Sequence, residues 1–263
     1  MIVLITGASG GLGPVLGKTL VERGLTVYGT MRKPEGDYPF PMLPMEITDD
    51  ASVTACIDEV MSREGRLDVV INCVNRMLIG SVEEASMEEI EQLYQTGLFG
   101  TMRVCKAAVP VMKKQGAGTI VNMSSMGGLL AVPLMSTYTS AKSALETFSE
   151  ALYQELRDDN IDVVVMQPVA MRMDRPATGN HLAMAQNIAE GSPSNRLLQR
   201  MAKDTAASKL TPEMVSEKIY QVITSDKKPF RIAMDKARVI GVLKRLLPGG
   251  ALRSMVYGMV YGK

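Results

Sequence analysis

Tryptophan is absent from the 263 residues, histidine occurs once, and the three cysteines form no C-x-x-C pair. Because Cys56, Cys73 and Cys105 are far apart and odd in number, we expect reduced, buried thiols rather than a disulfide framework or a zinc site. The lone His181 is interpreted as incidental, and no metal site can be assembled around it. No run of about eighteen apolar residues occurs, and the first strand-like run, MIVLITG, begins at residue 1. We therefore expect a cytoplasmic protein without a signal peptide.

The chain also lacks an excess of charge, with 29 basic side chains, 28 acidic ones and a net charge of +1. Acids and bases alternate, so no nucleic-acid partner is expected. The exception is the segment at about 237–263, which contains bases but no acid and has apolar residues at helical spacing. Two interpretations stay open: packing beside the substrate entrance or a partner subunit, which is favoured, or contact with a membrane surface as a basic amphipathic helix.

Short apolar runs alternate with longer helix-like stretches along the chain. The expected strands are 2–6, 26–30, 69–72, 119–123 and 163–167, and the expected helices are 14–23, 51–63, 87–114 and 139–158. The runs are too apolar for half-exposed strands, so the pattern predicts one α/β domain, a doubly wound parallel sheet with helices on both faces. The polar stretch at about 171–209 follows a strand end, where such sheets bind ligands, and is expected to form a substrate lid.

The stretch TGASGGLG at residues 6–13 follows an expected strand and precedes an expected helix. Closely spaced glycines in this place let backbone amides at a helix N-terminus approach a pyrophosphate. The spacing of Gly7, Gly11 and Gly13 differs from G-x-G-x-x-G. A glycine-rich turn without a ligand therefore remains the alternative.

Tyr138 and Lys142 in STYTSAK stand four residues apart and are neighbours on one helical face. An ammonium beside a phenol stabilises the phenolate and is expected to lower the pKa of Tyr138 toward neutral pH. The pair can then exchange a proton with a substrate oxygen. A plain surface contact between the two side chains is the alternative.

Three motifs together resemble those of the short-chain dehydrogenase/reductase family, and the resemblance covers nearly the whole chain. TGASGGLG is similar to the family's TGxxxGxG, NMSS ends in Ser125 where the family has its catalytic serine, and Tyr138 with Lys142 is similar to YxxxK. Ser125 stands thirteen residues before Tyr138, close to the family's usual spacing.

The resemblance implies a Rossmann-like fold, a nicotinamide cofactor and hydride transfer between the cofactor and a ketone or secondary alcohol. It implies that Tyr138 is the general acid/base, that Ser125 hydrogen-bonds the carbonyl oxygen, and that Lys142 holds the ribose and tunes Tyr138. Two donors would then converge on an oxygen that gains negative charge. Relatives are commonly homodimers or homotetramers. The cofactor-binding positions implied are Gly7, Ser9, Gly11, Leu12, Gly13, Arg32, Glu46, Ile47, Asn72, Tyr138, Lys142 and Pro168.

Cofactor choice depends on the end of the second expected strand, where Arg32 and Lys33 occur and no acid does. A basic side chain there pairs with the 2′-phosphate on the adenosine ribose of NADP(H), whereas an acidic one would accept a hydrogen bond from the 2′-hydroxyl of NAD(H). We therefore expect NADP(H), with Arg32 and Ser9 on the phosphate. Two solvated bases are the alternative. Glu46 stands where the family usually has an Asp near the adenine.

Five positions depart from the family pattern. In NCVN, Cys73 replaces the second Asn of NNAG and Asn75 replaces its glycine. Gly97 stands where the family has a helix-bending catalytic Asn. Val169 replaces the glycine of PG, and Met173 replaces the threonine that commonly binds the carboxamide. These changes fall where the nicotinamide and its protons are expected.

The expected function is NADP(H)-dependent reduction of a hydrophobic ketone or oxidation of the corresponding alcohol, with a lipid, terpenoid, polyketide or steroid-like substrate. Flexible apolar side chains are expected around the substrate, unless they merely pack the core; they are residues 126–135, Met171, Met173, Leu182 and Met184. Because of the departures from the family pattern, two alternatives to this function stay open. One is an enzyme that catalyses a non-redox step such as proton transfer, elimination or cyclisation at Tyr138, and the other is a non-catalytic binding protein.

Overall fold

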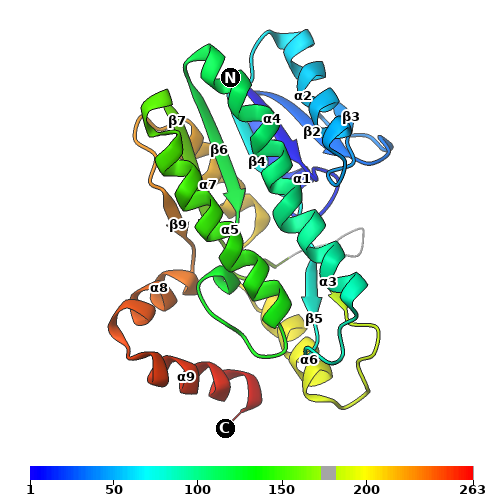
Figure 1. The fold of residues 1–263 in the computed structure, drawn as a ribbon, viewed down its shortest axis with the longest axis vertical. Helices are drawn as coiled ribbons and strands as arrows, with labels where there is room; N and C mark the ends of the chain where they lie inside the picture. The colour runs from blue at the N-terminus through cyan, green and yellow to red at the C-terminus, as the bar shows by residue number, and fades with distance from the viewer. Residues whose placement is uncertain (173–181, 263) are drawn as a thin grey trace.

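A seven-stranded parallel sheet forms the centre of the molecule (Figure 1). The structure, a computed structural model, describes residues 1–172 and 182–262. The strand order is β3-β2-β1-β4-β6-β7-β9, and β5 pairs with β8 in a separate two-stranded sheet. The strands are β1 (Ile2–Thr6), β2 (Thr26–Met31), β3 (Met42–Pro44), β4 (Val69–Asn72), β5 (Met77–Ile79), β6 (Gly118–Met123), β7 (Ile161–Gln167), β8 (Leu182–Met184) and β9 (Arg231–Ala233).

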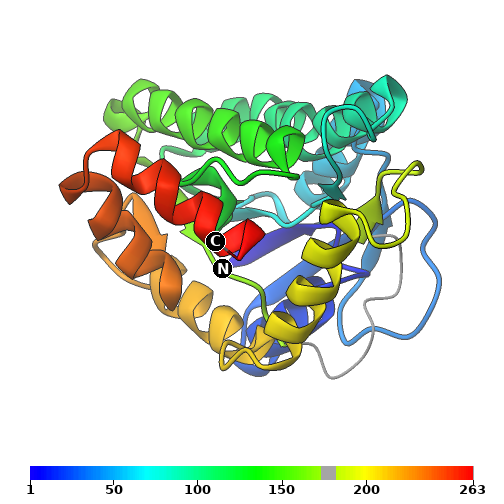
Figure 2. The same cartoon turned by 90° about the horizontal axis from the view of Figure 1, so that it is seen from below.

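Helices cover both faces of the sheet, as Figures 1 and 2 show. One core lies under α2 (Asp50–Glu64), α4 (Gly100–Gln115) and α5 (Ser136–Glu155), and the other lies under α1 (Gly13–Glu22) and α7 (Pro212–Ile223). The predicted α/β fold is therefore confirmed. The remaining helices are α3 (Met87–Tyr94), α6 (Pro193–Ala206), α8 (Lys236–Leu246) and α9 (Gly249–Tyr261).

The helix expected at 87–114 is three consecutive helical segments. It starts as α3 with a capping box, in which Ser86 accepts from the Glu89 amide and Glu89 accepts from the Ser86 amide. A π-helix at Gln95–Phe99 then precedes α4. Such π turns change the direction of a helix and frequently occur at functional sites.

The C-terminal helices pack along the chain that follows Ser125. Ile240 of α8 and Val256 of α9 are buried together with Leu130. The Arg200 guanidinium of α6 also donates to the Met259 carbonyl near the end of α9. The inner face of this segment thus packs against the body of the chain. Its outer face leaves apolar side chains exposed, at Val239, Val242 and Leu246.

We found no helix among residues 1–172 and 182–262 that is long and apolar enough to cross a membrane. The three cysteines are free, and burial raises the pKa of each thiol to about 12. Cys56 and Cys105 are buried and Cys73 is half-buried. These thiols are therefore protonated and unreactive near neutral pH.

Candidate active site

The glycine-rich turn joins β1 to α1 and is closed on one side and open on the other. Gly7 has φ +66°, and a Cβ there would lie 2.8 Å from Val74 Cγ2, so a larger residue would clash. Gly11 has φ +57°, and a Cβ there would meet none of the described atoms within 4 Å. Helix α1 then begins at Gly13, and its N-cap residue Leu12 makes no side-chain cap hydrogen bond. The open side therefore has backbone amides and space for an anion.

The same turn is tied to the end of β2. The Ala8 amide donates to the Thr30 carbonyl at 3.0 Å, and the Gly7 amide donates to Thr30 Oγ1 at 3.2 Å. Ser9 and Arg32 follow these bonded residues in the chain, after the ends of β1 and β2, and so belong to the same edge of the sheet. Arg32 is exposed there.

Two further predicted cofactor residues, Glu46 and Ile47, follow the end of β3. Glu46 is half-buried, and its Oε1 accepts from the Thr48 amide at 3.1 Å and from Thr48 Oγ1 at 2.8 Å. Ile47 is buried against Gly100 of α4. The Glu46 carboxylate thus stabilises its own turn.

Asn72 ends β4 and turns its side chain into the interior. Its Nδ2 donates to Asn122 Oδ1 at 2.9 Å, and Asn122 Nδ2 donates to Ser149 Oγ at 2.9 Å. This buried chain of hydrogen bonds joins β4, β6 and α5. These hydrogen bonds hold the carboxyl ends of β4 and β6 in place, and the residues that follow these ends lead into the candidate site.

Ser125, Tyr138 and Lys142, the Ser–Tyr–Lys group, are brought together by β6 and α5. Ser125 follows β6 and accepts from the Gly127 amide at 3.1 Å, which leaves its hydroxyl hydrogen available. Tyr138 and Lys142 occupy successive turns of α5 and are 3% and 4% exposed. Lys142 Nζ donates to the Met123 carbonyl at 2.8 Å and lies 6.0 Å from the centre of the Tyr138 ring.

The protonation of Tyr138 differs from the expectation. Burial raises the pKa of Tyr138, and hydrogen bonding from Ser125 and Asn75 lowers it by less. The Lys142 ammonium does not produce the predicted decrease; it is bonded to the Met123 carbonyl and lies 6.0 Å from the centre of the Tyr138 ring. Tyr138 therefore holds its proton at neutral pH and is prepared to donate it.

An ion pair between the buried Glu146 and the exposed Arg231, which we did not predict, lies one turn beyond Lys142. Glu146 is 6% exposed and accepts from Gln167 Nε2 at 2.9 Å and from Arg231 Nε at 3.0 Å. Arg231 also donates to Glu150 at 2.7 Å. Burial lowers the pKa of Lys142 to about 8, and the negative charge of Glu146 opposes this decrease. The spacing of Glu146 and Glu150 was visible in the sequence, but Arg231 lies 85 residues away from Glu146.

Gly97 lies inside the π-helix, so the unusual turn is present without the expected Asn side chain. Its carbonyl accepts from Thr101 Oγ1 at 3.1 Å. A Cβ on Gly97 would meet none of the described atoms within 4 Å. The site therefore has room for the missing side chain.

The segment expected to be a lid contacts the cluster around Tyr138. Ala185 and Leu197 of this segment are buried with Tyr138 and with Leu78 of β5. Met171 packs instead on the α1–α7 side of the sheet. Met173 and His181 lie outside the described residues, as do the side chains of Leu182 and Met184.

The chain after β7 also contacts the Ser125 turn. The Pro168 carbonyl accepts from the Met126 amide at 3.1 Å. Val169, which follows, is partly buried on the α1–α7 side. Pro168 is therefore placed beside the serine turn.

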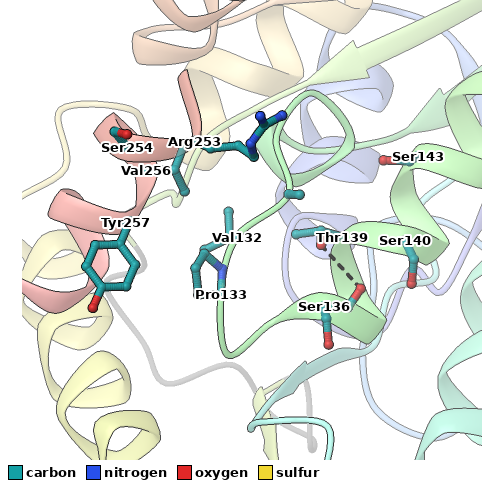
Figure 3. A pocket seen from close by; sticks show the side chains of 11 residues that line it. Val132, Pro133, Ser136, Thr139, Ser140, Ser143, Arg253, Ser254, Val256 and Tyr257 are labelled. Carbon is teal, nitrogen blue, oxygen red and sulfur yellow. Dashed lines mark hydrogen bonds between the residues drawn. The ribbon is translucent and has the colours of Figure 1, made fainter. Parts of the chain in front are cut away.

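A pocket of about 870 Å³ lies between α5, α9 and the loop before α5 (Figure 3). Its lining is Ala131, Val132, Pro133, Ser136, Thr139, Ser140, Ser143, Arg253, Ser254, Val256 and Tyr257. The α5 residues of this lining project from the helix on a side other than that of Tyr138. None of the three residues of the Ser–Tyr–Lys group lines this pocket.

Comparisons with known proteins agree with this geometry. The family model described as "short chain dehydrogenase" matches residues 1–180. A protein from Bacteroides thetaiotaomicron described as 3-ketodihydrosphingosine reductase is 40% identical over 168 residues, which are 64% of this chain and 62% of that relative. The match thus spans less than two thirds of the relative's length.

Two solved structures have the same fold. A short chain dehydrogenase/reductase from Burkholderia phymatum, in complex with NAD, has a TM-score of 0.78 and 20% identity, covering 93% of this chain and 92% of that one. A short chain dehydrogenase from Burkholderia cenocepacia, in complex with NADP, has a TM-score of 0.76 and 20% identity, covering 97% and 96%.

Proposed function

This chain belongs to the short chain dehydrogenase family, and from that membership we propose that it reduces a hydrophobic ketone with NADPH, using Tyr138 as the proton donor. The observation that carries the proposal is the buried, protonated Tyr138 beside Ser125. The three residues Ser125, Tyr138 and Lys142 are the proposed catalytic residues.

The glycine-rich turn fits a dinucleotide because its open side at Gly11 leaves space for a pyrophosphate against the start of α1. In this proposal Gly7, Leu12 and Gly13 shape the turn, Ser9 and Arg32 hold a 2′-phosphate, and Ile47 lies near the adenine. When bound, the nicotinamide supplies a hydride to the carbonyl carbon.

The chain's own residues act on the carbonyl oxygen. Tyr138 donates its proton as negative charge develops there, and the Ser125 hydroxyl donates a hydrogen bond to the same atom. Lys142 contributes a positive charge held in place by the Met123 carbonyl. Its lowered pKa, about 8, means that this charge is lost as the pH rises above that value.

An apolar substrate is favoured by the side chains that surround the Ser125 turn. Leu130 and Met135 are buried near it, and Met126, Leu129 and Val132 are partly buried. The relative named as a reductase of 3-ketodihydrosphingosine supports a lipid ketone. In this proposal α6 with Leu197 is the lid over the substrate, and α9 forms the wall behind the loop.

One observation favours a second candidate, a non-redox step at Tyr138. Gly97 leaves the family's proton relay without its amide side chain. The two functions are distinguished by titrating the protein with NADPH and then adding long-chain ketones. Ketone-dependent loss of NADPH absorbance supports reduction, whereas NADPH binding without turnover of any ketone supports the second candidate.

The substitution Arg32→Asp tests the proposed cofactor choice. We expect the Kd for NADPH to rise by about 10- to 100-fold, because a charged pair to the 2′-phosphate is replaced by repulsion. The Kd for NADH should stay within about threefold, since NADH lacks this phosphate. Fluorescence titration with both cofactors measures the two values, and Lys18→Asp, at an exposed side chain on α1, is the matched control. Unchanged affinities would place the phosphate elsewhere.

The substitution Gly97→Asn tests whether the site is a relay with one missing member. Because the space at Gly97 is open, we expect the variant to fold and its kcat for ketone reduction to rise on the order of 10-fold. Gly97→Ala adds a Cβ without an amide and should leave kcat unchanged. Equal rates in both variants and in the wild type would mean that proton supply does not pass this position.

The proposed assembly is a homodimer or homotetramer that pairs the outer faces of α4 and α5. Size-exclusion chromatography with light scattering measures the mass directly. A monomer at all concentrations contradicts this part of the proposal.

A further inference from the structure

Helix α8 carries a stripe of apolar side chains on the face that does not pack against the rest of the chain. Val239, Val242 and Leu246 are 61%, 54% and 74% exposed. Their spacing of three and four residues places them on one side of the helix. Ala237 and Ile240, on the other side, are buried. The helix is therefore held by one apolar face and presents a second one to solvent.

Exposed apolar side chains are concentrated in the last two helices. Ten large apolar side chains are exposed within residues 1–172 and 182–262, and five of them belong to α8 and α9. These helices have only 11 and 13 residues. Single exposed apolar residues are ordinary on a protein surface, whereas a concentration of them indicates an interaction site.

Basic side chains border the stripe on both sides. Arg238 and Arg245 stand four residues before and three residues after Val242. On the other side, Lys236 stands three residues before Val239. Residues at these spacings are neighbours on a helix surface. All three bases are exposed, so their charges surround the apolar stripe at the surface.

No acidic side chain balances these bases locally. Residues 236–263 contain six lysines and arginines and no aspartate or glutamate. In the part of the chain that the structure describes, none of the ion pairs involves a base of α8 or α9. Because the net charge of the whole protein is only +1, this positive charge is a local feature. It complements a negatively charged partner.

We propose that α8 binds an anionic lipid surface, lying in the plane of the membrane with its apolar stripe among the acyl chains and its bases among the headgroups. An apolar stripe bordered by bases is the arrangement of helices that lie at a membrane interface. Acidic phospholipids supply the negative charge that the segment lacks. In both views α8 lies at the edge of the molecule, where a flat surface can reach it (Figures 1 and 2). The inference goes beyond the proposed reductase function and does not depend on it.

A second copy of the chain fits this face less well than a lipid surface. In a symmetric pair of copies the same patch faces itself. The bases of one α8 would then oppose the same bases of the other, and like charges across an interface weaken binding. A lipid surface buries the same apolar stripe and attracts the bases.

Flotation of the full chain with lipid vesicles tests the inference. One set of vesicles contains phosphatidylcholine alone, and the other contains about 30% phosphatidylserine. We expect the partition coefficient to be higher by about 10-fold or more with phosphatidylserine. It should fall as the salt concentration is raised from about 0.05 M to about 0.5 M, because salt screens the attraction between the bases and the headgroups.

Replacement of the stripe by serine tests the apolar contribution. Val239→Ser, Val242→Ser and Leu246→Ser together should lower the partition coefficient by about 10- to 100-fold, because their apolar surface no longer enters the lipid. All three side chains are exposed, so the variant should fold, and a circular-dichroism melting curve checks this. The matched control replaces three exposed apolar side chains of other elements by serine and should bind as the wild type does; these are Val82, Met87 and Met214.

The absence of tryptophan from the chain allows a second readout. Val242→Trp places one indole in the stripe, and we expect its emission to move to shorter wavelength when phosphatidylserine vesicles are added, because the ring enters an apolar environment. Val82→Trp, at an exposed position between β5 and α3, should show no such shift.

Three results would overturn the inference. One is a wild type that does not float with phosphatidylserine vesicles; if light scattering then shows a dimer that the triple serine variant loses, the stripe belongs to a second copy. Another is equal flotation of the wild type and the triple serine variant, which would assign the binding to charge alone. The third is equal binding to both sets of vesicles, which would remove the bases from the interaction.

Discussion

Replacement of Tyr138 by phenylalanine is expected to lower kcat for ketone reduction by about 10³-fold, within the range for loss of a positioned proton donor. The phenylalanine ring fills the same buried space as the tyrosine ring. That ring packs closely on Gly127, since a Cβ added to Gly127 would lie 3.0 Å from Tyr138 Cε1. The variant should therefore fold. The Kd for NADPH should stay within about threefold because the turn at residues 7–13 is untouched. Stopped-flow measurement of NADPH oxidation and fluorescence titration give the two values.

Tyr28→Phe is the matched control for this substitution. Tyr28 is a buried tyrosine of β2 whose hydroxyl donates to Glu64 at 2.6 Å, away from the Ser–Tyr–Lys group. Its removal should lower the free energy of unfolding by about 1 kcal/mol and leave kcat unchanged. If Tyr138→Phe retained the wild-type kcat, Tyr138 would not be the proton donor and the reductase mechanism would be wrong.

The central strands could be predicted from the sequence because each is buried on both faces and is apolar throughout. All five expected strands occur, with ends shifted by two residues or fewer. β3 and β9 were not predicted, because each has three residues and a single buried one, Leu43 or Ile232, at an edge of the sheet. Edge strands of this length leave no apolar run to recognise.

The site could be predicted only in part, for a related physical reason. Motif spacing predicted that Ser125, Tyr138 and Lys142 would come together, since the serine strand and the Tyr–Lys helix are close in sequence. The direction of the Tyr138 pKa was predicted wrongly, because helical spacing shows that Lys142 is a neighbour but does not show that the Met123 carbonyl takes its ammonium. Burial is a property of the assembled fold, and here it dominates.

Replacement of Lys142 by methionine is expected to separate activity from stability. Removing the ammonium should lower kcat/KM for ketone reduction by about 10²-fold, because a buried positive charge beside the developing negative charge is lost. The exposed Lys106 of α4 is the matched control, and Lys106→Met should leave kcat/KM unchanged. A Lys142→Met variant with wild-type kcat/KM would remove this ammonium from the mechanism.

The stability of the same variant follows from the lowered pKa. Because the Lys142 pKa falls from 10.5 to about 8 on folding, the unfolded chain binds the proton more tightly, and the buried charge costs about 3 kcal/mol at pH 7. Methionine removes this cost but leaves the Met123 carbonyl without its donor, a loss of about 1–3 kcal/mol. The variant should therefore be as stable as the wild type at pH 7, or slightly more stable.

The difference in the free energy of unfolding between the wild type and Lys142→Met should change with pH in a definite direction. As the pH rises from about 8 to 10.5, the wild-type Lys142 loses its proton in the folded state first, so its contribution to instability disappears. The free energy of unfolding of the wild type should therefore increase relative to Lys142→Met over this interval. Urea denaturation of both proteins at pH 7 and pH 10.5 measures the difference. A constant difference between the two proteins would show that the Lys142 pKa is not lowered on folding, and that the positive charge at the site is held without a cost to the fold.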